Sequence, residues 1–197
     1  INLTLGIKRY LSISELKGLM FLNLAVSAGG SMILVNTIIL VRSSLKLSEI
    51  AFSITMLIFG AGCIFAAIII PYLSKEMTAS RIMLAGSNLL SLVFVTLAFW
   101  LILFDFIWFV LLAAWFISGF GYTLLLTPMG RVIRKVSSVD EFSQVYSAQF
   151  SLSHLCWLFM YPLSGYLMTI SGGSFTLLTL ALLMVCSNII AAWYFRS

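Results

Sequence analysis

Long apolar stretches alternate with short polar segments along the chain, and this pattern predicts helices that cross a membrane. A helix needs about 20 apolar residues to span the hydrocarbon core of a bilayer. Stretches of that length run over residues 18–41, 50–73, 82–104, 106–128, 142–168 and 175–195. All 11 basic and 6 acidic residues lie outside them. We therefore predict an all-α, polytopic membrane protein with six transmembrane helices in a single domain of residues 1–197.

The connections between these stretches carry further signals. Only Asp105 separates the third stretch from the fourth, which predicts a very tight hairpin. The segment 129–141 is the most polar of the chain, and we predict an inner loop there. Ser138 followed by Glu141 fits a capping box, so we expect the fifth helix to begin near Val139.

The first 15 residues predict a short cytoplasmic segment of amphipathic character. They contain Lys8, Arg9 and Tyr10 but have no apolar core long enough for a signal peptide. Because the chain begins with Ile1, we expect that an upstream part has been removed or is absent.

Composition excludes an ordinary soluble domain. Hydrophobic residues make up 62% of the chain, charged residues only 9%, and the mean hydropathy is +1.14. The net charge of +5 is not arranged as a basic stripe with interleaved aromatic residues, so we expect no nucleic-acid partner. Cys63, Cys156 and Cys186 are widely separated, which supports neither a disulfide framework nor a CxxC metal site.

The distribution of basic residues predicts the orientation in the membrane. One side receives nine of the 11 Lys and Arg residues, and the other side receives Arg42 and Lys46. Under the positive-inside rule this bias places both termini in the cytoplasm. The inner basic loops are expected to hold Lys75, Arg81, Arg131, Arg134 and Lys135. Of these, Arg131, Arg134 and Lys135 can also bind anionic lipid headgroups or pair with acids such as Asp140 and Glu141.

The stretch 142–168 is unusually polar for a helix in lipid. On a helical projection, one stripe holds Ser147, Ser151, His154, Trp157 or Leu158, and Tyr161, and a second stripe holds Gln149, Ser153, Cys156 and Met160. His154 lies near the middle of the stretch, where an ionisable side chain is a candidate for function. A neutral histidine bonded to a neighbouring helix is the alternative.

The first stretch also carries polar side chains. Asn23, Ser27 and Ser31 share one face, and Asn36 lies on another face nearer the outside. These side chains predict either oxygen ligands for a transported species or plain hydrogen bonds between helices. We count Asn23 and Asn36 among the candidates for a substrate pathway, with Ser151, His154, Tyr161, Gln149 and Cys156.

Enzymatic readings find little support. A zinc protease of the HExxH type needs two histidines, and His154 is the only one in the chain. Ser151 and His154 share one helix, but no acid and no oxyanion loop accompany them. We expect no enzyme and no cofactor.

With six predicted helices, both ends inside and a basic loop at residues 71–81 between the second and third helices, the chain resembles the carboxy-terminal six-helix half of a major facilitator superfamily transporter. In that family a glycine, an aspartate and several arginines mark the loop between the second and third helices, and residues 71–81 retain only its basic character. The run 147–167, SAQFSLSHLCWLFMYPLSGYL, looks like the penultimate helix of the nickel-resistance exporters.

The resemblance implies one half of a secondary active transporter that works by alternating access in the bacterial inner membrane. Its expected partners are an amino-terminal six-helix half or a second copy, the lipid bilayer and a transported ion or small molecule. Efflux of a divalent metal such as nickel is the first hypothesis, with His154 as a metal ligand. The alternatives are efflux of a small organic substrate or drug and, in another class, a six-helix membrane scaffold without transport.

Overall fold

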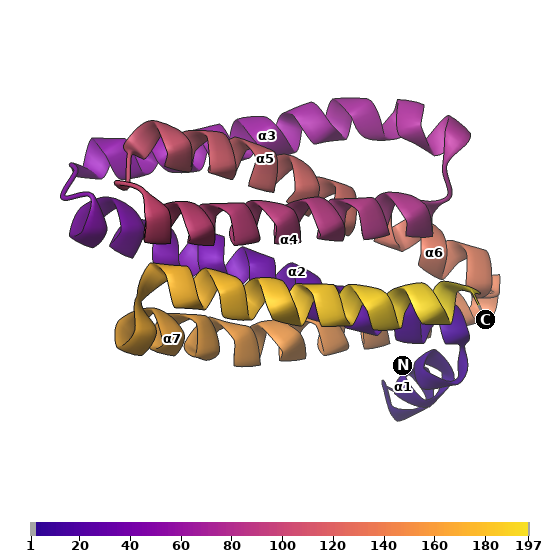
Figure 1. The fold of residues 1–197 in the computed structure, drawn as a ribbon. Helices are drawn as coiled ribbons and strands as arrows, with labels where there is room; N and C mark the ends of the chain where they lie inside the picture. Colours follow the sequence, from indigo (N-terminus) through magenta and orange to yellow (C-terminus); the bar gives the residue numbers. More distant parts are fainter. Residues whose placement is uncertain (1–2, 197) are drawn as a thin grey trace.

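The fold consists of helices packed side by side. A computed structural model describes the backbone of residues 3–196 and the side chains of residues 6–196. No strand occurs within that range. The elements are α1 (Leu3–Ser12), α2 (Ser14–Ile38), the π-helix η1 (Ile39–Ser44), α3 (Glu49–Glu76), α4 (Ala79–Leu103), α5 (Trp108–Leu126), α6 (Met129–Val136) and α7 (Val139–Arg196). The long elements run roughly parallel or antiparallel (Figure 1), which confirms the predicted all-α architecture.

The element α7 consists of two antiparallel limbs joined at one residue. Its helical geometry breaks at Gly172, where φ is 76° and ψ is 179°. This backbone conformation is open to glycine and strained for residues with a Cβ atom. In Figure 1 the chain reverses direction between residues 139–171 and 173–196. The loop predicted after residue 168 is thus reduced to a single turn residue.

Five helical segments of the described residues are long and apolar enough to cross a membrane when α7 is counted once. Each of the six predicted stretches lies largely within one of them, and the two limbs of α7 contain the last two stretches. The protein is therefore a multi-pass membrane protein.

The predicted hairpin at Asp105 is wider than expected. Residues 104–107 are all non-helical, so the turn is not made by Asp105 alone. The indole Nε1 of Trp100 donates to the Asp105 carbonyl oxygen at 3.2 Å. This bond ties the end of α4 to the turn, and the predicted boundaries at this point were wrong by one or two residues.

The predicted inner loop was also wrong, because most of it forms α6. Pro128 sits at the N-cap of this helix, where a missing backbone N–H breaks no helical hydrogen bond. Met129, Val132, Ile133 and Val136 then recur at the spacing of one helix face. Val132 and Ile133 are buried, while the basic residues of α6 are exposed. The segment is polar because it is an amphipathic surface helix.

The packing makes α2 central and α3 peripheral. The element α2 packs chiefly against α7, α3 packs against α5, and α4 packs against both α5 and α7. In the apolar stretch that includes α2, 72% of the residues are buried inside the protein, whereas in that of α3 only 22% are buried. Most of α3 therefore faces outward, where lipid or another protein can accept apolar side chains.

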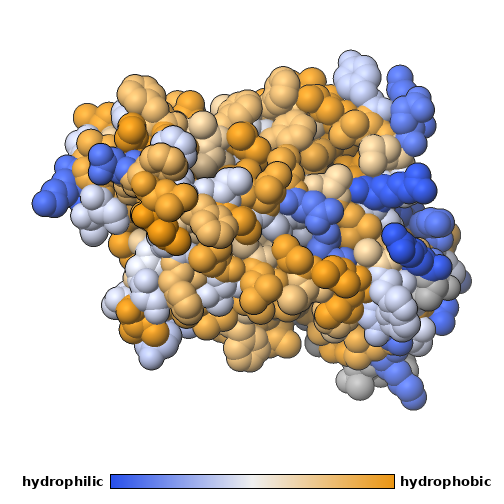
Figure 2. Space-filling view, viewed as in Figure 1, coloured by the Kyte–Doolittle hydropathy of each residue, from blue (hydrophilic) through white to orange (hydrophobic). Residues whose placement is uncertain are grey.

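The two ends of the bundle differ in charge. The helices α1 and α6, the α3–α4 connection and the last turn of α7 lie at one end, and η1 and the α4–α5 connection lie at the other (Figure 1). The first end carries the nine basic residues that the sequence assigned to one side. In Figure 2 hydrophilic side chains gather at this end, while apolar side chains cover the middle. We refer to it as the basic end.

Candidate functional site

A pocket of about 410 Å³ opens among α2, α5, α6 and the first limb of α7. Its lining combines aromatic rings with amide and hydroxyl groups. The lining residues are Asn23, Val26, Tyr122, Leu126, Thr127, Met129, Gly130, Tyr146, Gln149, Phe150, Ser153, His154 and Trp157. The lining contains no carboxylate, which distinguishes it from a site built for a hard cation.

One face of α7 supplies about half of this lining. Its residues recur at intervals of three and four, which places them on one side of a helix. They are Tyr146, Gln149, Phe150, Ser153, His154 and Trp157. This face takes His154 and Trp157 from the first predicted stripe and Gln149 and Ser153 from the second. The observed pocket face therefore lies between the two predicted stripes.

The amide of Gln149 links three other elements beside the pocket. The Tyr10 hydroxyl of α1 donates to Gln149 Oε1. Gln149 Nε2 donates to Asn23 Oδ1 of α2 at 2.9 Å and contacts Met129 Sδ of α6 at 2.8 Å. Tyr10 is fully buried, and this burial raises the pKa of its phenol well above the usual range. The predicted amphipathic segment therefore reaches the pocket through one tyrosine.

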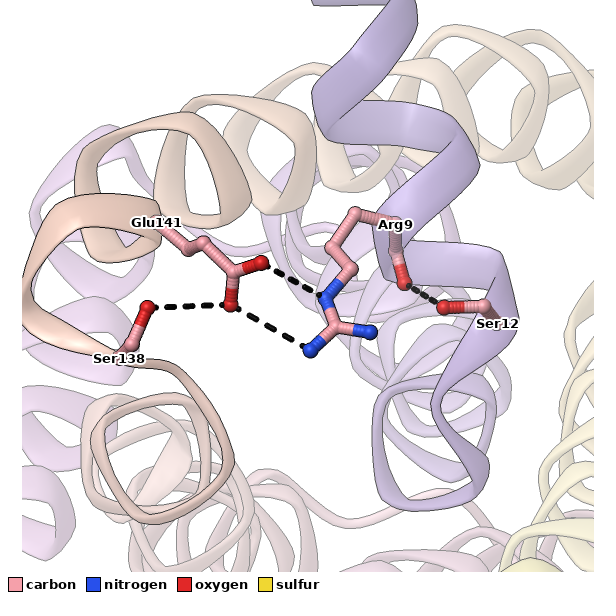
Figure 3. A network of polar contacts seen from close by, with 4 residues as sticks. All are labelled: Arg9, Ser12, Ser138 and Glu141. Atoms are coloured by element: carbon pink, nitrogen blue, oxygen red, sulfur yellow. Dashed lines mark hydrogen bonds and ion pairs between the residues drawn. The ribbon is translucent and has the colours of Figure 1, made fainter.

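An ion pair fastens α1 to the start of α7 at the surface (Figure 3). Arg9 Nε lies 3.1 Å from Glu141 Oε1. The Ser138 hydroxyl donates to Glu141 Oε2 at 3.1 Å. The helix α7 begins at Val139, as the capping pattern predicted. Closer in, a Cβ atom on Gly6 would lie 2.7 Å from the Gln144 carbonyl oxygen, so the two helices are in backbone contact.

His154 lines the pocket with one ring nitrogen already engaged. His154 Nδ1 lies 2.8 Å from the Phe150 carbonyl oxygen. A carbonyl oxygen only accepts, so Nδ1 carries the proton in this contact, and in the neutral imidazole Nε2 then keeps a lone pair. The ring also packs against the Phe150 ring, with centroids 4.0 Å apart. The imidazole can therefore offer Nε2 to a ligand as an acceptor or as one metal bond.

The other predicted pathway residues lie away from the pocket lining. Asn36 Nδ2 donates to Ser164 Oγ at 2.8 Å, a hydrogen bond between α2 and α7. Ser151 Oγ donates to the Ser147 carbonyl oxygen at 3.0 Å within α7. The remaining two are the half-buried Cys156 and the exposed Tyr161, whose ring packs at a tilt against the Trp157 ring. The pocket thus brings together His154, Gln149 and Asn23 only.

The predicted inner basic residues are exposed at the basic end. Arg131 and Arg134 line a second hollow of about 350 Å³ that shares Thr127, Gly130 and Tyr146 with the pocket. Lys135 lies on α6 as well, while Lys75 and Arg81 flank the α3–α4 connection; all three are exposed. The pocket therefore continues toward a surface that carries positive charge.

Metal ligands are sparse around the pocket. Among the described residues, no group of three or more His, Cys, Asp or Glu side chains could hold a metal ion. Within the chain, His154 is the strongest metal ligand of the lining, supported by the weaker Met129 thioether and neutral oxygens.

Sequence reasoning missed the parts that α1, α5 and α6 take in the site. Met129 begins an amphipathic helix, so its periodicity was a usable signal. Tyr10 lies on the buried face of α1. An amphipathic segment was predicted there, and such a segment has one buried face. No feature of the sequence separates Tyr122 from the other aromatic residues of its stretch.

Comparison with protein families decides what kind of molecule this is. The model of the Major Facilitator Superfamily matches residues 19–197. The chain belongs to the major facilitator superfamily. No curated protein and no solved structure shows significant similarity to the chain. Membership supports a secondary transporter, and members of the superfamily are transporters rather than enzymes. In a major facilitator protein a pocket between helices is a candidate binding site for the transported molecule.

Proposed function

We propose that the chain forms one wall of the substrate path of an alternating-access efflux carrier, and that the pocket beside α2 and α7 binds the transported molecule. The observation that carries this proposal is the lining, in which four large aromatic rings surround two amide side chains. Such a mixture of apolar surface and a few polar groups is typical of sites for small organic molecules. A second six-helix half, or a second copy of the chain, supplies the facing wall.

The proposal includes an orientation. The basic end faces the cytoplasm of a bacterial cell and the end with Arg42 and Asp105 faces outward, because basic residues are retained on the cytoplasmic side of the inner membrane. Single-cysteine labelling with an impermeant reagent in intact cells tests it. A cysteine placed at Arg134 is expected to stay unlabelled and one at Lys46 to react. Labelling at position 134 would overturn the orientation.

A small organic molecule is our first candidate for the cargo. The test uses the full-length protein in a strain without its main drug pumps and measures accumulation of aromatic dyes of positive, zero and negative charge. Trp157→Ala removes the largest ring of the pocket and is expected to abolish efflux of the transported dye. Trp193→Ala is the matched control, because Trp193 is exposed in the last turns of α7. Equal efflux by the two variants would contradict the placement of the site.

Nickel is the second candidate, and one observation favours it. His154 lines the pocket with Nε2 available, and an imidazole nitrogen suits Ni²⁺. If nickel is the cargo, cells that express His154→Ala accumulate more nickel than wild-type cells and lose nickel tolerance. Normal nickel export by a correctly inserted His154→Ala protein would remove this candidate.

A further inference from the structure

The contacts of Gln149 fix the direction of a short hydrogen-bond chain. A thioether sulfur can accept a hydrogen bond but cannot donate one. The edge of the Gln149 amide that faces Met129 Sδ is therefore the amino edge, Nε2. The opposite edge, Oε1, accepts from the Tyr10 hydroxyl. The chain of donors consequently runs from Tyr10 through Gln149 to Asn23.

This direction leaves Asn23 with unused donors. Asn23 Oδ1 accepts from Gln149 Nε2, while Asn23 Nδ2 has no hydrogen-bond partner among the described residues. Asn23 is only 2% exposed and lines the pocket. A buried donor without a partner is destabilising, because it has lost its hydrogen bonds to water. An acceptor atom of a bound molecule would remove that cost.

We propose that Asn23 Nδ2 donates to a hydrogen-bond acceptor of the transported molecule, and that Tyr10 acts through Gln149 as a positioning residue for this donor. The cargo is then an aromatic organic molecule with a carbonyl or carboxylate oxygen. The inference rests on the proposed function of the pocket and names its substrate class. It also explains why a helix outside the membrane spans sends a buried hydroxyl toward this site.

The charge around the pocket favours the same class. Arg131 and Arg134 lie where the pocket continues toward the basic end, and among the described side chains no carboxylate forms an ion pair with either. Two guanidinium groups that form no ion pair within the described residues attract an anion and repel a cation. The donor inside and the charges outside therefore both disfavour a metal cation as cargo.

The test measures binding of three probes that share a naphthalene ring. They are 1-naphthoate, its neutral methyl ester and 1-naphthylmethylammonium. The first two offer carbonyl or carboxylate oxygen, and the third offers only donors and a positive charge. Saturable binding to the full-length protein is measured by scintillation proximity with one radiolabelled probe and competition by the others. We expect wild type to bind the two acceptor probes and to discriminate against the ammonium probe.

Two conservative variants separate recognition from structure. Asn23→Asp replaces the donor by an acceptor of the same size and is expected to raise the Kd of the acceptor probes at least about tenfold and to improve ammonium binding. Tyr10→Phe removes only the hydroxyl and is expected to raise the Kd of the acceptor probes by roughly threefold to tenfold, with no change for the ammonium probe. Tyr166→Phe, at an exposed position of α7, is the matched control.

The outcomes distinguish the two levels of the proposal. If wild type binds none of the probes, the proposed function and this inference fail together. If wild type binds them and both variants leave the ratio of Kd values unchanged, the inference is wrong while the pocket remains the binding site. Gln149→Glu repeats the test where Asn23→Asp does not fold, because the new carboxylate turns the Asn23 amide around and should invert the preference in the same way.

Discussion

Two interfaces inside the bundle follow opposite designs. Between α3 and α5 the backbones touch: a Cβ atom on Gly62 would lie 2.0 Å from the Phe116 carbonyl oxygen, and one on Gly119 would lie 2.1 Å from the Phe59 carbonyl oxygen. Between α2 and the first limb of α7 the helices also pack together, but their interface borders a pocket of about 410 Å³. Amide groups such as Gln149 bridge this second interface.

The difference shows that, in a membrane domain, one helix interface can stabilise the fold while another holds the binding site. Lipid is as apolar as a leucine side chain, so helices associate through close van der Waals contact, which small residues permit. The α3–α5 interface uses that contact at Gly62 and Gly119. The α2–α7 interface includes one side of the pocket, where a few directional hydrogen bonds hold its polar groups. We therefore expect substitutions at the first interface to affect folding and substitutions at the second to affect binding.

The largest effect is expected at the close interface. Gly62→Ala and Gly119→Ala force the α3 and α5 backbones apart and should each cost about 3 kcal/mol of stability. Gly60→Ala is the matched control in the same helix, because a Cβ atom there meets nothing within 4 Å. The measurement is the yield of monodisperse protein and its thermal midpoint in detergent. Equal behaviour at Gly60 and Gly62 would refute the comparison.

The same substitution at the pocket should change binding and spare the fold. A Cβ atom on Gly30 would lie 2.1 Å from the ring edge of Trp157, which can move into the pocket. Gly30→Ala is expected to weaken binding of a pocket ligand by about 2 kcal/mol, roughly thirtyfold, at an unchanged thermal midpoint. Gly165→Ala, where the Cβ atom makes an ordinary 3.6 Å contact, should bind normally. A large fall in the midpoint of Gly30→Ala would contradict us.

The attachment of α1 should respond to alkaline pH. The phenol pKa of Tyr10 is raised above its ordinary value of 10.0 by burial. Above that value an undocked phenol ionises while the docked phenol keeps its proton, so the undocked state binds fewer protons and docking weakens by about 1.4 kcal/mol per pH unit. Protease cleavage of α1 should therefore accelerate from about pH 10 upward. Tyr10→Phe should lack this dependence, and an identical pH profile in both proteins would exclude the tyrosine as its source.

The smallest effect is expected for the ion pair that fastens α1. The side chains of Arg9 and Glu141 are 49% and 38% exposed, and such pairs contribute about 0.5 kcal/mol. Arg9→Gln should therefore loosen α1 slightly at low salt and not at high salt. Lys8→Gln, at the neighbouring exposed position, is the control. A loss as large as that of the buried Tyr10 contact would show that the surface pair has been underestimated.

The sequence could predict the helices better than the site. Hydrophobic length alone located every long helix, because an apolar stretch has no other stable arrangement in lipid. It misjudged α6, since charge was weighed above the spacing of Met129, Val132, Ile133 and Val136. The pocket needs contacts between α1, α2, α6 and α7, and no one-dimensional pattern reveals that Tyr10 and Gln149 meet. Of the predicted pathway residues, only His154, Gln149 and Asn23 lie together in the lining of the pocket.

The turn at Gly172 gives one point of the chain a reversed handedness. Its φ of 76° and ψ of 179° mirror the extended conformation that ordinary L-amino acids adopt, and a Cβ atom there would meet nothing within 4 Å. Glycine is therefore required at position 172 by the backbone conformation alone and not by contact with neighbouring atoms. A D-alanine introduced by chemical ligation would fit this position without strain, whereas its L-enantiomer would oppose the reversal on which the antiparallel pairing of the two limbs depends.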